Sequence, residues 1–239
     1  MDNVIVIIGP TASGKTSLSI ELAKDLNGEI VSADSMQIYR YMDIGTAKPD
    51  EEERQGIKHY LIDEVNPDEE FSVARFQQLA YKYIDQILRK GKLPIVVGGT
   101  GLYINSLLYN INFSETVSDW KLRERLKNEA KEKGNAYIHD MLKKIDPEAA
   151  AKIHPNDVKR VIRAIEVYEH TKKTISYHQK VSRLEPPKYN YIKIGLRMDR
   201  QKLYDRINKR VDLMIEKGLV REIEKLVELG YDKNSVAMQ

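Results

Sequence analysis

The sequence predicts an α/β fold: a P-loop NTPase-like parallel sheet with helices on both faces and an inserted all-helical subdomain. Two observations predict it. Up to about residue 113, short apolar runs alternate with amphipathic stretches, as strands and helices do in a parallel sheet. Residues 114–185 then show helical patterns alone, before a last apolar run at Tyr191–Leu196. We therefore expect an α/β core formed by residues 1–113 and 186–239, and a helical insertion at 114–185.

The first apolar run, Val4–Ile8, leads directly into a phosphate-binding loop of the G-x-x-x-x-G-K-[ST] type. Its glycines allow a tight turn that points N–H groups at one anion, and the helix that follows, with the apolar stripe Leu18, Leu22 and Leu26, adds its positive N-terminal dipole. A chance Gly-rich turn is disfavoured because strand, loop and helix all lie where phosphate binding needs them. Lys15 is expected to reach the outer phosphate, and the Thr16 hydroxyl to hold Mg²⁺. The loop comprises Gly9, Pro10, Thr11, Ala12, Ser13, Gly14, Lys15 and Thr16.

The rest of the core is predicted from apolar patterns and their capping residues. Ser72 is expected to cap a long helix that Gly91 closes. The acidic stretch 50–54 is a surface turn or a helix start. The other predicted elements are strands at 29–32, 59–62 and 93–97, and helices at 201–217 and 220–229, ended by Gly218 and Gly230.

The insertion is divided by residues that cap or break helices. Trp120, near its start, is expected to pack rather than to stack on a base. Residues 171–188, with Pro186-Pro187, are predicted to be a linker that returns to the sheet. The capping or breaking residues are Asp119, Gly134, Pro147 and Pro155.

Composition excludes several kinds of chemistry. The 239 residues include no cysteine, so disulfides, thiol nucleophiles and cysteine zinc sites are excluded, which suits a reducing cytoplasm. Met1-Asp2-Asn3 enters the first strand directly, so we expect no signal peptide. No apolar run approaches membrane-spanning length, and we expect a monomer. The five histidines are too scattered to suggest a metal cluster.

Charge is distributed unevenly along the chain. Residues 1–120 hold 11 Lys and Arg against 18 Asp and Glu, a net −7, whereas residues 121–239 hold 28 against 18, a net +10. A basic second half suggests a polyanionic partner, although solvated Lys and Arg on helix faces are the ordinary alternative.

Several blocks of the sequence form a recognisable set: residues 32–40 and 42–49, Gly98-Gly99-Thr100-Gly101-Leu102-Tyr103, Asn156-Asp157 with Arg160, Val161, Arg163, Ala164, Ile165, Glu166 and Val167, and Arg206 through Leu219. These blocks resemble the tRNA dimethylallyltransferase (IPP transferase) family. They span nearly the whole chain, and only the P-loop is shared widely with other families. The resemblance implies transfer of a dimethylallyl group from dimethylallyl diphosphate to the exocyclic amine of the adenosine 3′ of the anticodon in tRNA. It also implies a C-terminal continuation that this sequence lacks, so we interpret the chain as a shortened form.

This chemistry needs cations opposite the leaving diphosphate and a base for the amine proton. Since the carboxyl ends of parallel strands meet at one edge of a sheet, Gly14, Asp34 and Thr100 should converge on one crevice. Asp34 is placed to be the base, although it could instead be a helix N-cap or contact magnesium indirectly. Thr100 should approach the diphosphate bridge, its alternative being a tight strand-to-helix turn. This strand lacks the terminal acid that many ATP hydrolases use.

Basic side chains on two helices complete the expected site. Arg210 lies on the edge of an apolar stripe, and the resemblance implies that it grips diphosphate, with Arg206 as second choice; a salt bridge is the alternative. The resemblance also places two basic segments of the insertion on the anticodon stem-loop, and their alternative is a solvated face. The tRNA-binding set is Asp34, Ser35, Met36, Gln37, Thr100, Arg123, Val158, Lys159, Arg160, Val161, Ile162 and Arg163.

Two other functions compete with prenyl transfer. A small-molecule kinase would bind ATP at the loop and use Asp34 to accept the proton of a substrate hydroxyl. A non-catalytic, nucleotide-dependent RNA-binding module would need the basic half of the chain but neither Asp34 nor Thr100.

Overall fold

A computed structural model describes residues 1–111, 119–182 and 184–238 of the chain. The chain divides into two compact units, one formed by Met1–Leu108 with Pro187–Gln239 and the other by Tyr109–Pro186. The expected division lay a few residues away, at 113/114 and 185/186. Within the described residues, no helix is both long enough and apolar enough to cross a bilayer.

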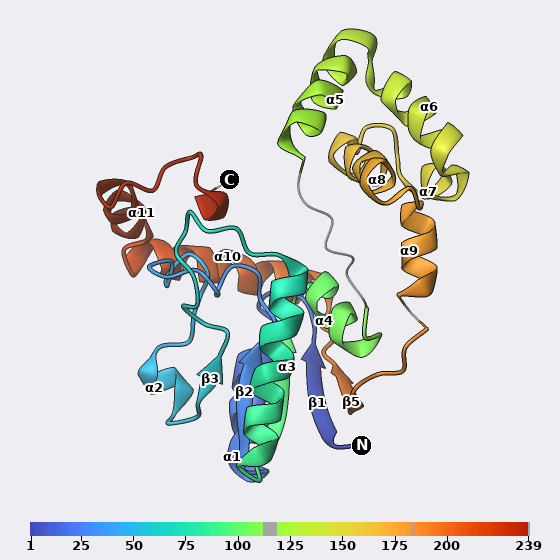
Figure 1. The fold of residues 1–239 in the computed structure, drawn as a ribbon. Helices are drawn as coiled ribbons and strands as arrows, with labels where there is room; N and C mark the ends of the chain where they lie inside the picture. Colours follow the sequence, from blue (N-terminus) through green and yellow to red (C-terminus); the bar gives the residue numbers. More distant parts are fainter. Residues whose placement is uncertain (112–118, 183, 239) are drawn as a thin grey trace. The chain divides into compact units, whose positions relative to one another are not determined.

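The first unit is built on a five-stranded sheet in the order β3-β2-β4-β1-β5, in which every pairing is parallel (Figure 1). The order confirms the predicted α/β fold class. Because β4 lies between β1 and β2, the carboxyl ends of these three strands stand next to one another at one edge of the sheet. The strands are β1 (Asn3–Ile8), β2 (Gly28–Ser32), β3 (His59–Tyr60), β4 (Leu93–Gly98) and β5 (Asn190–Gly195).

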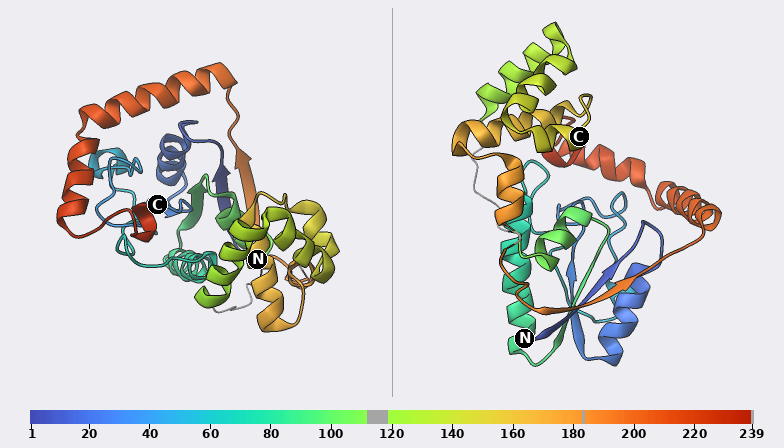
Figure 2. Two further views of the ribbon diagram at one scale, coloured as in Figure 1. Left: turned by 90° about the horizontal axis from the view of Figure 1, so that it is seen from above. Right: turned by 90° about the vertical axis from the view of Figure 1, so that its right-hand side faces the viewer.

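Helices cover both faces of this sheet. The side chains of β1 point alternately to the two faces, so each face has apolar residues for a helix to cover. Val4 and Val6 pack on the side of α3 (Val73–Arg89), while Ile5 and Ile7 pack on the side of α1 (Lys15–Asp25). Figure 2 shows the two helices on opposite sides of the strands. Ser72 caps α3, as predicted, by accepting a hydrogen bond from the Arg75 N–H at 3.2 Å.

The predicted apolar stripe of α1 is wrong in part. The residues it buries are Ser19, Ile20 and Ala23, whereas Leu26 is 46% exposed. Leu18 and Leu22 pack only partly against the sheet. The end of the helix lies close to the sheet, since a Cβ on Gly28 at the start of β2 would be 3.3 Å from the Ala23 Cα.

The remaining helices of this unit lie beside the strand ends or on the surface. Asp50 starts α2 with a capping box, so the acidic stretch is a helix start. No residue of α10 is fully buried: of its apolar stripe, Leu203, Ile207 and Met214 are half-buried, and Val211 and Ile215 are exposed. These elements are α2 (Glu51–Arg54), α4 (Gly101–Leu108), α10 (Arg200–Glu216), α11 (Leu219–Glu228) and the 3₁₀ turn η1 (Val236–Met238).

A buried carboxylate, Glu29, lies near the amino-terminal ends of β2 and β4. Glu29 accepts hydrogen bonds from the Tyr60 hydroxyl at 2.7 Å and from the ammonium groups of Lys90 and Lys92 at 2.9 Å each. Burial alone would raise the pKa of Glu29, but its bonds to Lys90, Lys92 and Tyr60 outweigh burial and lower the pKa to about 2. The charged form is therefore the one that the fold stabilises.

The second unit is helical, as predicted, with a core centred on α6 and α8. Asp119, Gly134 and Pro147 stand at helix ends as expected. The linker prediction for 171–188 is wrong in part: Thr174 caps a further helix, α9, by accepting a hydrogen bond from the Tyr177 N–H. The helices are α5 (Trp120–Lys133), α6 (Asn135–Ile145), α7 (Pro147–Lys152), α8 (Val158–Thr171) and α9 (Ile175–Val181).

Candidate active site

The phosphate-binding loop joins β1 to α1 through left-handed backbone at Ala12 (φ 61°) and Gly14 (φ 92°). Helix α1 begins without a side-chain cap, and no backbone hydrogen bond among the described residues uses the N–H groups of Gly14, Lys15 and Thr16. Unpaired amides at a helix N-terminus are donors for an anion. Gly9 is needed for close packing, since a Cβ there would lie 2.9 Å from the Ser13 Oγ.

Lys15 is held inside this loop. Its ammonium donates to the carbonyl oxygens of Gly9 at 3.0 Å and Pro10 at 2.7 Å. Burial lowers the pKa of Lys15; the Asp34 charge opposes that shift and the Arg210 charge adds to it. The loop, one carboxylate and a second cation therefore act on each other electrostatically.

Asp34 follows β2 and closes a turn through one of its two oxygens. Oδ1 accepts from the N–H of Met36 at 2.9 Å and more weakly from that of Gln37 at 3.4 Å. No hydrogen bond in the described part of the chain uses Oδ2. The alternative of a helix N-cap is not observed, because a turn and not a helix follows Asp34. This turn uses one carboxylate oxygen and leaves the other to accept a proton.

Thr100 and Gly98 join the end of β4 to the end of β2. The Thr100 Oγ1 accepts from the Ser35 N–H at 3.1 Å, and the Thr100 N–H donates to the Ala33 carbonyl at 3.4 Å. A Cβ on Gly98 would lie 2.1 Å from that carbonyl oxygen, so only glycine permits this approach. The structure thus brings Asp34 and Thr100 together, as parallel strand order predicted.

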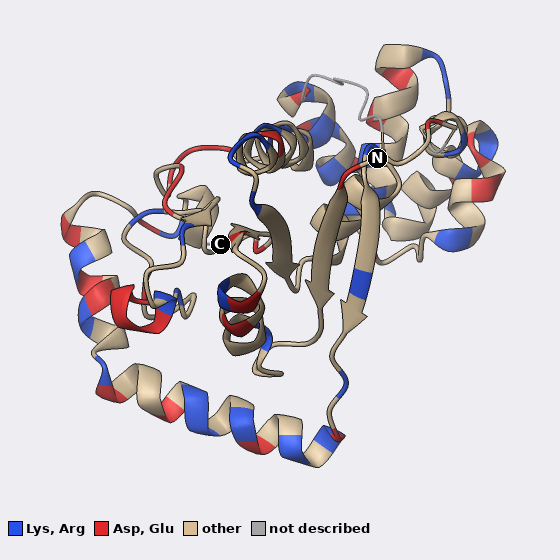
Figure 3. Ribbon diagram, turned by 90° about the horizontal axis from the view of Figure 1, so that it is seen from below, with Lys and Arg blue, Asp and Glu red and all other residues tan. Residues whose placement is uncertain are grey.

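Helix α10 supplies the second cation, Arg210, and Figure 3 shows Lys and Arg recurring along this helix. Burial lowers the pKa of the half-buried Arg210, and the charges of Asp34 and Glu53 oppose the shift. No carboxylate of the described residues lies within ion-pair distance of Arg210, so the salt-bridge alternative is not observed there. Arg206 is exposed on the same helix.

A cavity of about 790 Å³ lies between the phosphate-binding loop and α10. Its lining includes loop residues 12–16 together with Arg206 and Arg210, and a third wall comes from residues 47–50. The expected convergence of Gly14, Asp34 and Thr100 on one crevice is only partly observed, because Asp34 and Thr100 are not in this lining. Asp34 acts on the cavity through its charge, which opposes the lowering of the Lys15 and Arg210 pKa values by burial.

The residues that follow Asp34 have structural partners. The Gln37 amide accepts from the Ser32 Oγ at 3.1 Å and donates to the carbonyls of Thr46 at 3.4 Å and Ala47 at 3.2 Å. Gln37 therefore braces the 46–47 turn. Met36 is 37% exposed beside it.

Two of the expected tRNA-binding arginines are engaged inside the insertion. Arg123 forms a two-point ion pair with the fully buried Glu166, at 2.7 and 2.9 Å, and Arg163 reaches the same carboxylate at 2.5 Å. These bonds outweigh the burial that would raise the pKa of Glu166, so its pKa is lowered. The Arg123 pair ties α5 to α8, whereas the Arg163 pair lies within α8. The prediction that Trp120 packs is wrong: its ring is 60% exposed, with the Arg123 guanidinium 5.2 Å from its centroid.

The first turns of α8 divide into exposed and buried residues. Lys159 and Arg160 are exposed, and Arg160 has only a surface pair with Asp157 at 3.3 Å. Val161 and Ile162 belong to the core of the insertion, so their side chains cannot be the part that touches RNA. Val158 packs partly against the same core.

The residues of the loop fit Mg²⁺ only as a minor part of its coordination. Thr16 is exposed and lines the cavity, and Asp34 is the carboxylate that acts on Lys15. Mg²⁺ is commonly held by one or two protein oxygens together with substrate phosphates and water. Within the described residues there is no group of three His, Asp or Glu that could hold a metal ion by itself.

An α/β sheet with this loop defines a P-loop protein that binds a phosphorylated ligand. The chain belongs to the IPP transferase family, whose model matches residues 37–239. It is 75% identical, over 239 residues, to a tRNA dimethylallyltransferase of Acetivibrio thermocellus; the match covers 100% of this chain and 76% of that protein. It is 59% identical to one from Alkaliphilus oremlandii, with 99% and 75% covered. The chain is accordingly a transferase.

Solved structures show the same fold. A tRNA isopentenylpyrophosphate transferase from Bacillus halodurans is 46% identical, with a TM-score of 0.69 over 100% of this chain and 74% of that one. A eukaryotic dimethylallyltransferase acting on tRNA is 37% identical, with a TM-score of 0.81 over 96% and 56%. The resemblance seen in the sequence blocks is thereby confirmed.

Sequence reasoning missed two charged residues that shape the site. Lys48, with 3% of its side chain exposed, bonds the Tyr39 carbonyl at 2.5 Å and the carboxylates of Asp43 at 2.8 Å and Asp63 at 2.5 Å. Glu222 of α11 accepts from three backbone N–H groups of the loop after β2. Lys48 lies inside a family block that could have marked it, but no local pattern marks Glu222.

Proposed function

We propose that the P-loop crevice of this chain holds dimethylallyl diphosphate and that the chain transfers the dimethylallyl group to the exocyclic amine of an adenosine in tRNA. Family membership and the tRNA dimethylallyltransferases at 75% and 59% identity support the activity. The target is the adenosine 3′ of the anticodon. The cytoplasm, where tRNA is used, is the place of this reaction.

One observation carries the assignment of the diphosphate site. Lys15 and Arg210 face one cavity together with the unpaired amides of the loop, and Arg210 has no carboxylate at ion-pair distance in the described residues. A half-buried cation without a protein anion favours an anionic ligand. Diphosphate, with its several negative oxygens, matches this set of donors.

The reaction breaks one bond and forms another. The amine nitrogen attacks C1 of the dimethylallyl group while the C1–O bond breaks, and that electron pair leaves with the diphosphate. Lys15, Arg210 and the loop amides stabilise the charge that develops on the leaving group. Mg²⁺, held by the Thr16 hydroxyl and diphosphate oxygens, would supply further neutralising charge.

Asp34 removes the amine proton in this proposal. Its Oδ1 closes the turn at Met36, which orients the carboxylate, and Oδ2 accepts the proton. Thr100 fixes the geometry through the Ser35 N–H, so that the base and the adenosine share one strand edge. Gln37 shapes the adenosine side by bracing the 46–47 turn.

The insertion binds the anticodon stem-loop through its exposed cations. Lys159 and Arg160 are the phosphate contacts on α8, while Arg123 ties α5 to this helix through Glu166. The exposed Trp120 ring offers a stacking surface beside Arg123. The adenosine must leave the loop stack to reach the crevice, as bases modified by enzymes do.

Incubation with labelled dimethylallyl diphosphate, labelled ATP and bulk tRNA tests the proposal. We expect label from dimethylallyl diphosphate in tRNA, release of diphosphate, a requirement for Mg²⁺ and no ADP. Formation of ADP in step with turnover would support the kinase alternative and contradict the proposal. Binding of tRNA without incorporation of either label would support a non-catalytic module.

A further inference from the structure

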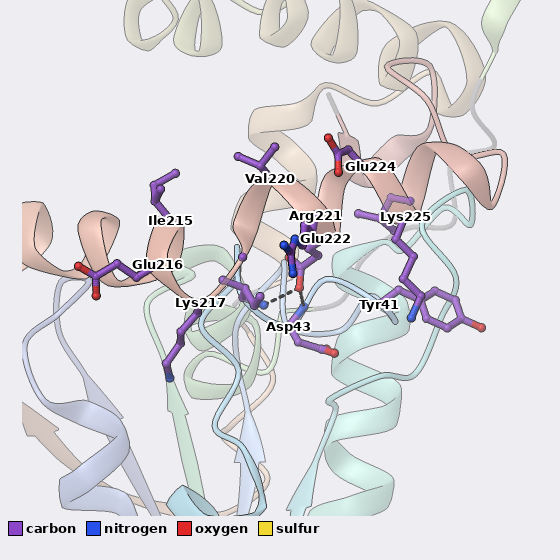
Figure 4. A pocket seen from close by; sticks show the side chains of 13 residues that line it. Tyr41, Asp43, Ile215, Glu216, Lys217, Val220, Arg221, Glu222, Glu224 and Lys225 are labelled. Carbon is purple, nitrogen blue, oxygen red and sulfur yellow. Dashed lines mark hydrogen bonds between the residues drawn. The ribbon is translucent and has the colours of Figure 1, made fainter.

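Glu222, in the first turn of α11, binds three consecutive backbone amides with one carboxylate. Its Oε2 accepts from the N–H groups of Asp43 and Ile44 at 2.7 Å each (Figure 4). Its Oε1 accepts from the N–H of Gly45 at 2.9 Å. Hydrogen bonds to a charged acceptor are about twice as strong as neutral ones. We name this contact the Glu222 latch.

The loop side of the Glu222 latch is rigid and connects to the adenosine side of the site. Lys48 binds the Asp43 carboxylate at 2.8 Å, and the Lys48 N–H donates to the Asp43 carbonyl at 2.9 Å. Gln37 donates to the Thr46 and Ala47 carbonyls of the same turn. The N–H groups that donate to Glu222 are therefore held in place relative to the end of β2, which Asp34 follows.

The helix side of the latch connects to the diphosphate side of the site. Helix α11 follows α10 after the left-handed Gly218 (φ 100°), and α10 carries Arg206 and Arg210 into the cavity above the phosphate-binding loop. No residue of α10 is buried, so apolar packing contributes little to its position. A second cavity, of about 780 Å³, lies between α11 and the loop around the latch.

We propose that Glu222 is a positioning residue: the latch holds the α10–α11 turn against the 43–45 loop and thereby sets the distance from Arg210 to the diphosphate. This inference rests on the proposed function of the crevice. Because the latch joins the loop braced by Gln37 to the helix that bears Arg210, it also fixes the separation between the adenosine and its electrophile. The latch requires a carboxylate, because a carboxylate has two acceptor oxygens and no donor, and can therefore accept hydrogen bonds from three N–H groups.

Glu222→Ala and Glu222→Gln test the latch, with Glu224→Gln as the matched control. Glu224 lies on the same helix and lines the same cavity, but no hydrogen bond of the described residues uses its carboxylate. For Glu222→Ala we expect kcat/KM for dimethylallyl diphosphate to fall by about 10- to 100-fold with a raised KM, as misplacement of a positioned group predicts. Glu222→Gln should show a smaller loss, because its amide oxygen can keep the bonds to Asp43 and Ile44. Its NH₂ group would face the Gly45 N–H, so that bond is lost. The control should match the wild type.

A purely structural Glu222 predicts different results. The melting temperature would fall, kcat would fall with the folded fraction, and KM would not change. A folded Glu222→Ala protein with wild-type KM for dimethylallyl diphosphate would overturn the inference. If Glu222→Ala does not fold, Gly45→Ala perturbs the latch from the loop side, since a Cβ there would lie 3.4 Å from the Glu222 Oε1 and 3.2 Å from Leu219. It should raise KM in the same direction, and an unchanged KM in both Gly45→Ala and Glu222→Gln would overturn the inference.

A double-mutant cycle with Arg210→Ala separates this inference from the proposed function. If Glu222 acts by placing Arg210, the double variant should resemble Arg210→Ala alone, because coupled residues are not additive. Effects that multiply would overturn the latch mechanism while leaving the diphosphate site intact. An Arg210→Ala protein with unchanged KM and kcat would instead contradict the proposed diphosphate site.

Discussion

Replacement of Asp34 by Asn separates proton removal from the structural role of this side chain. The Asp34 Oδ1 accepts from the Met36 N–H at 2.9 Å and from the Gln37 N–H at 3.4 Å, and an Asn Oδ1 can keep both bonds. The amide that replaces Oδ2 cannot accept a proton. We therefore expect Asp34→Asn to fold normally and bind both substrates, and to fail in the chemical step.

The magnitudes decide between the two roles. A side-chain hydrogen bond contributes about 0.5–1.5 kcal/mol to stability. Since the second bond is long, Asp34→Ala should lose about 1 kcal/mol and Asp34→Asn less. A positioned base contributes roughly 10²–10⁴ in rate, or about 2.7–5.4 kcal/mol in the barrier. The chemical effect should therefore exceed the structural one in Asp34→Asn.

Single-turnover transfer with both substrates saturating, together with a melting curve, measures both effects. Saturation removes any loss of binding from the measured rate, and Asp34→Ala reports the cost of losing the turn. A stable Asp34→Asn protein with a near wild-type single-turnover rate would refute Asp34 as the base.

Four further predictions follow from other parts of the structure. Lys15→Ala should lower kcat/KM, measured from initial rates of transfer, because a preorganised cation opposite the leaving group is lost. The loss should correspond to about 2.7–4 kcal/mol in the activation free energy. Neutralising Lys159 and Arg160 should weaken tRNA binding and leave dimethylallyl diphosphate binding unchanged. The slope of the logarithm of the tRNA binding constant against the logarithm of the salt concentration should become shallower by about 0.7–0.9 for each lost contact. Trp120→Ala should weaken tRNA binding by about 1–3 kcal/mol without lowering the melting temperature. The pKa of Glu29 is lowered to about 2 in the folded chain, from 4.5 in the unfolded chain. The ionised Glu29 therefore contributes fully to the free energy of unfolding above pH 4.5, and this contribution is lost as pH falls through 2. Denaturant unfolding at several pH values should show Glu29→Gln less stable at neutral pH, by about 3 kcal/mol, with a smaller loss in acid.

Each of these predictions has an outcome that contradicts it. Unchanged transfer by Lys15→Ala would remove the loop from the mechanism. An unaltered salt slope would show that Lys159 and Arg160 are merely solvated. A lower melting temperature of Trp120→Ala would mean that the ring packs. Equal stability of wild type and Glu29→Gln from neutral to acid pH would show that the Glu29 charge contributes nothing to the fold.

The parts of the fold that the sequence predicted have signals within one short segment. The phosphate-binding loop, the cap at Ser72 and the strand before Thr100 each depend on residues close together in the chain. Parallel strand order then placed Asp34 near Thr100, because the ends of such strands meet at one edge. The helix α9 was missed since the prolines at 186–187 suggested a linker, while the cap at Thr174 determined the local structure.

Which face of a helix is buried depends on the element that the helix packs against. The pattern of apolar residues in the sequence does not identify that element. The α1 stripe was expected at leucines, but packing against the sheet buries Ser19, Ile20 and Ala23 instead. Arg123 was expected on tRNA as a basic surface residue. The buried Glu166 engages it, 43 residues away.

By itself, the sequence determined the fold class, the phosphate-binding loop, the family and the candidate chemistry of Asp34, because these are written in contiguous motifs. Only the tertiary structure decided which cations have partners inside the protein and which face the crevice. It alone joined Glu222 to the amides of residues 43–45, which lie 177–179 positions earlier in the chain. Backbone amides carry no sequence signal, and a carboxylate on a helix surface has no local pattern that names its distant partner. Such contacts are set by the packing of whole elements, so they can be found only once the fold is known.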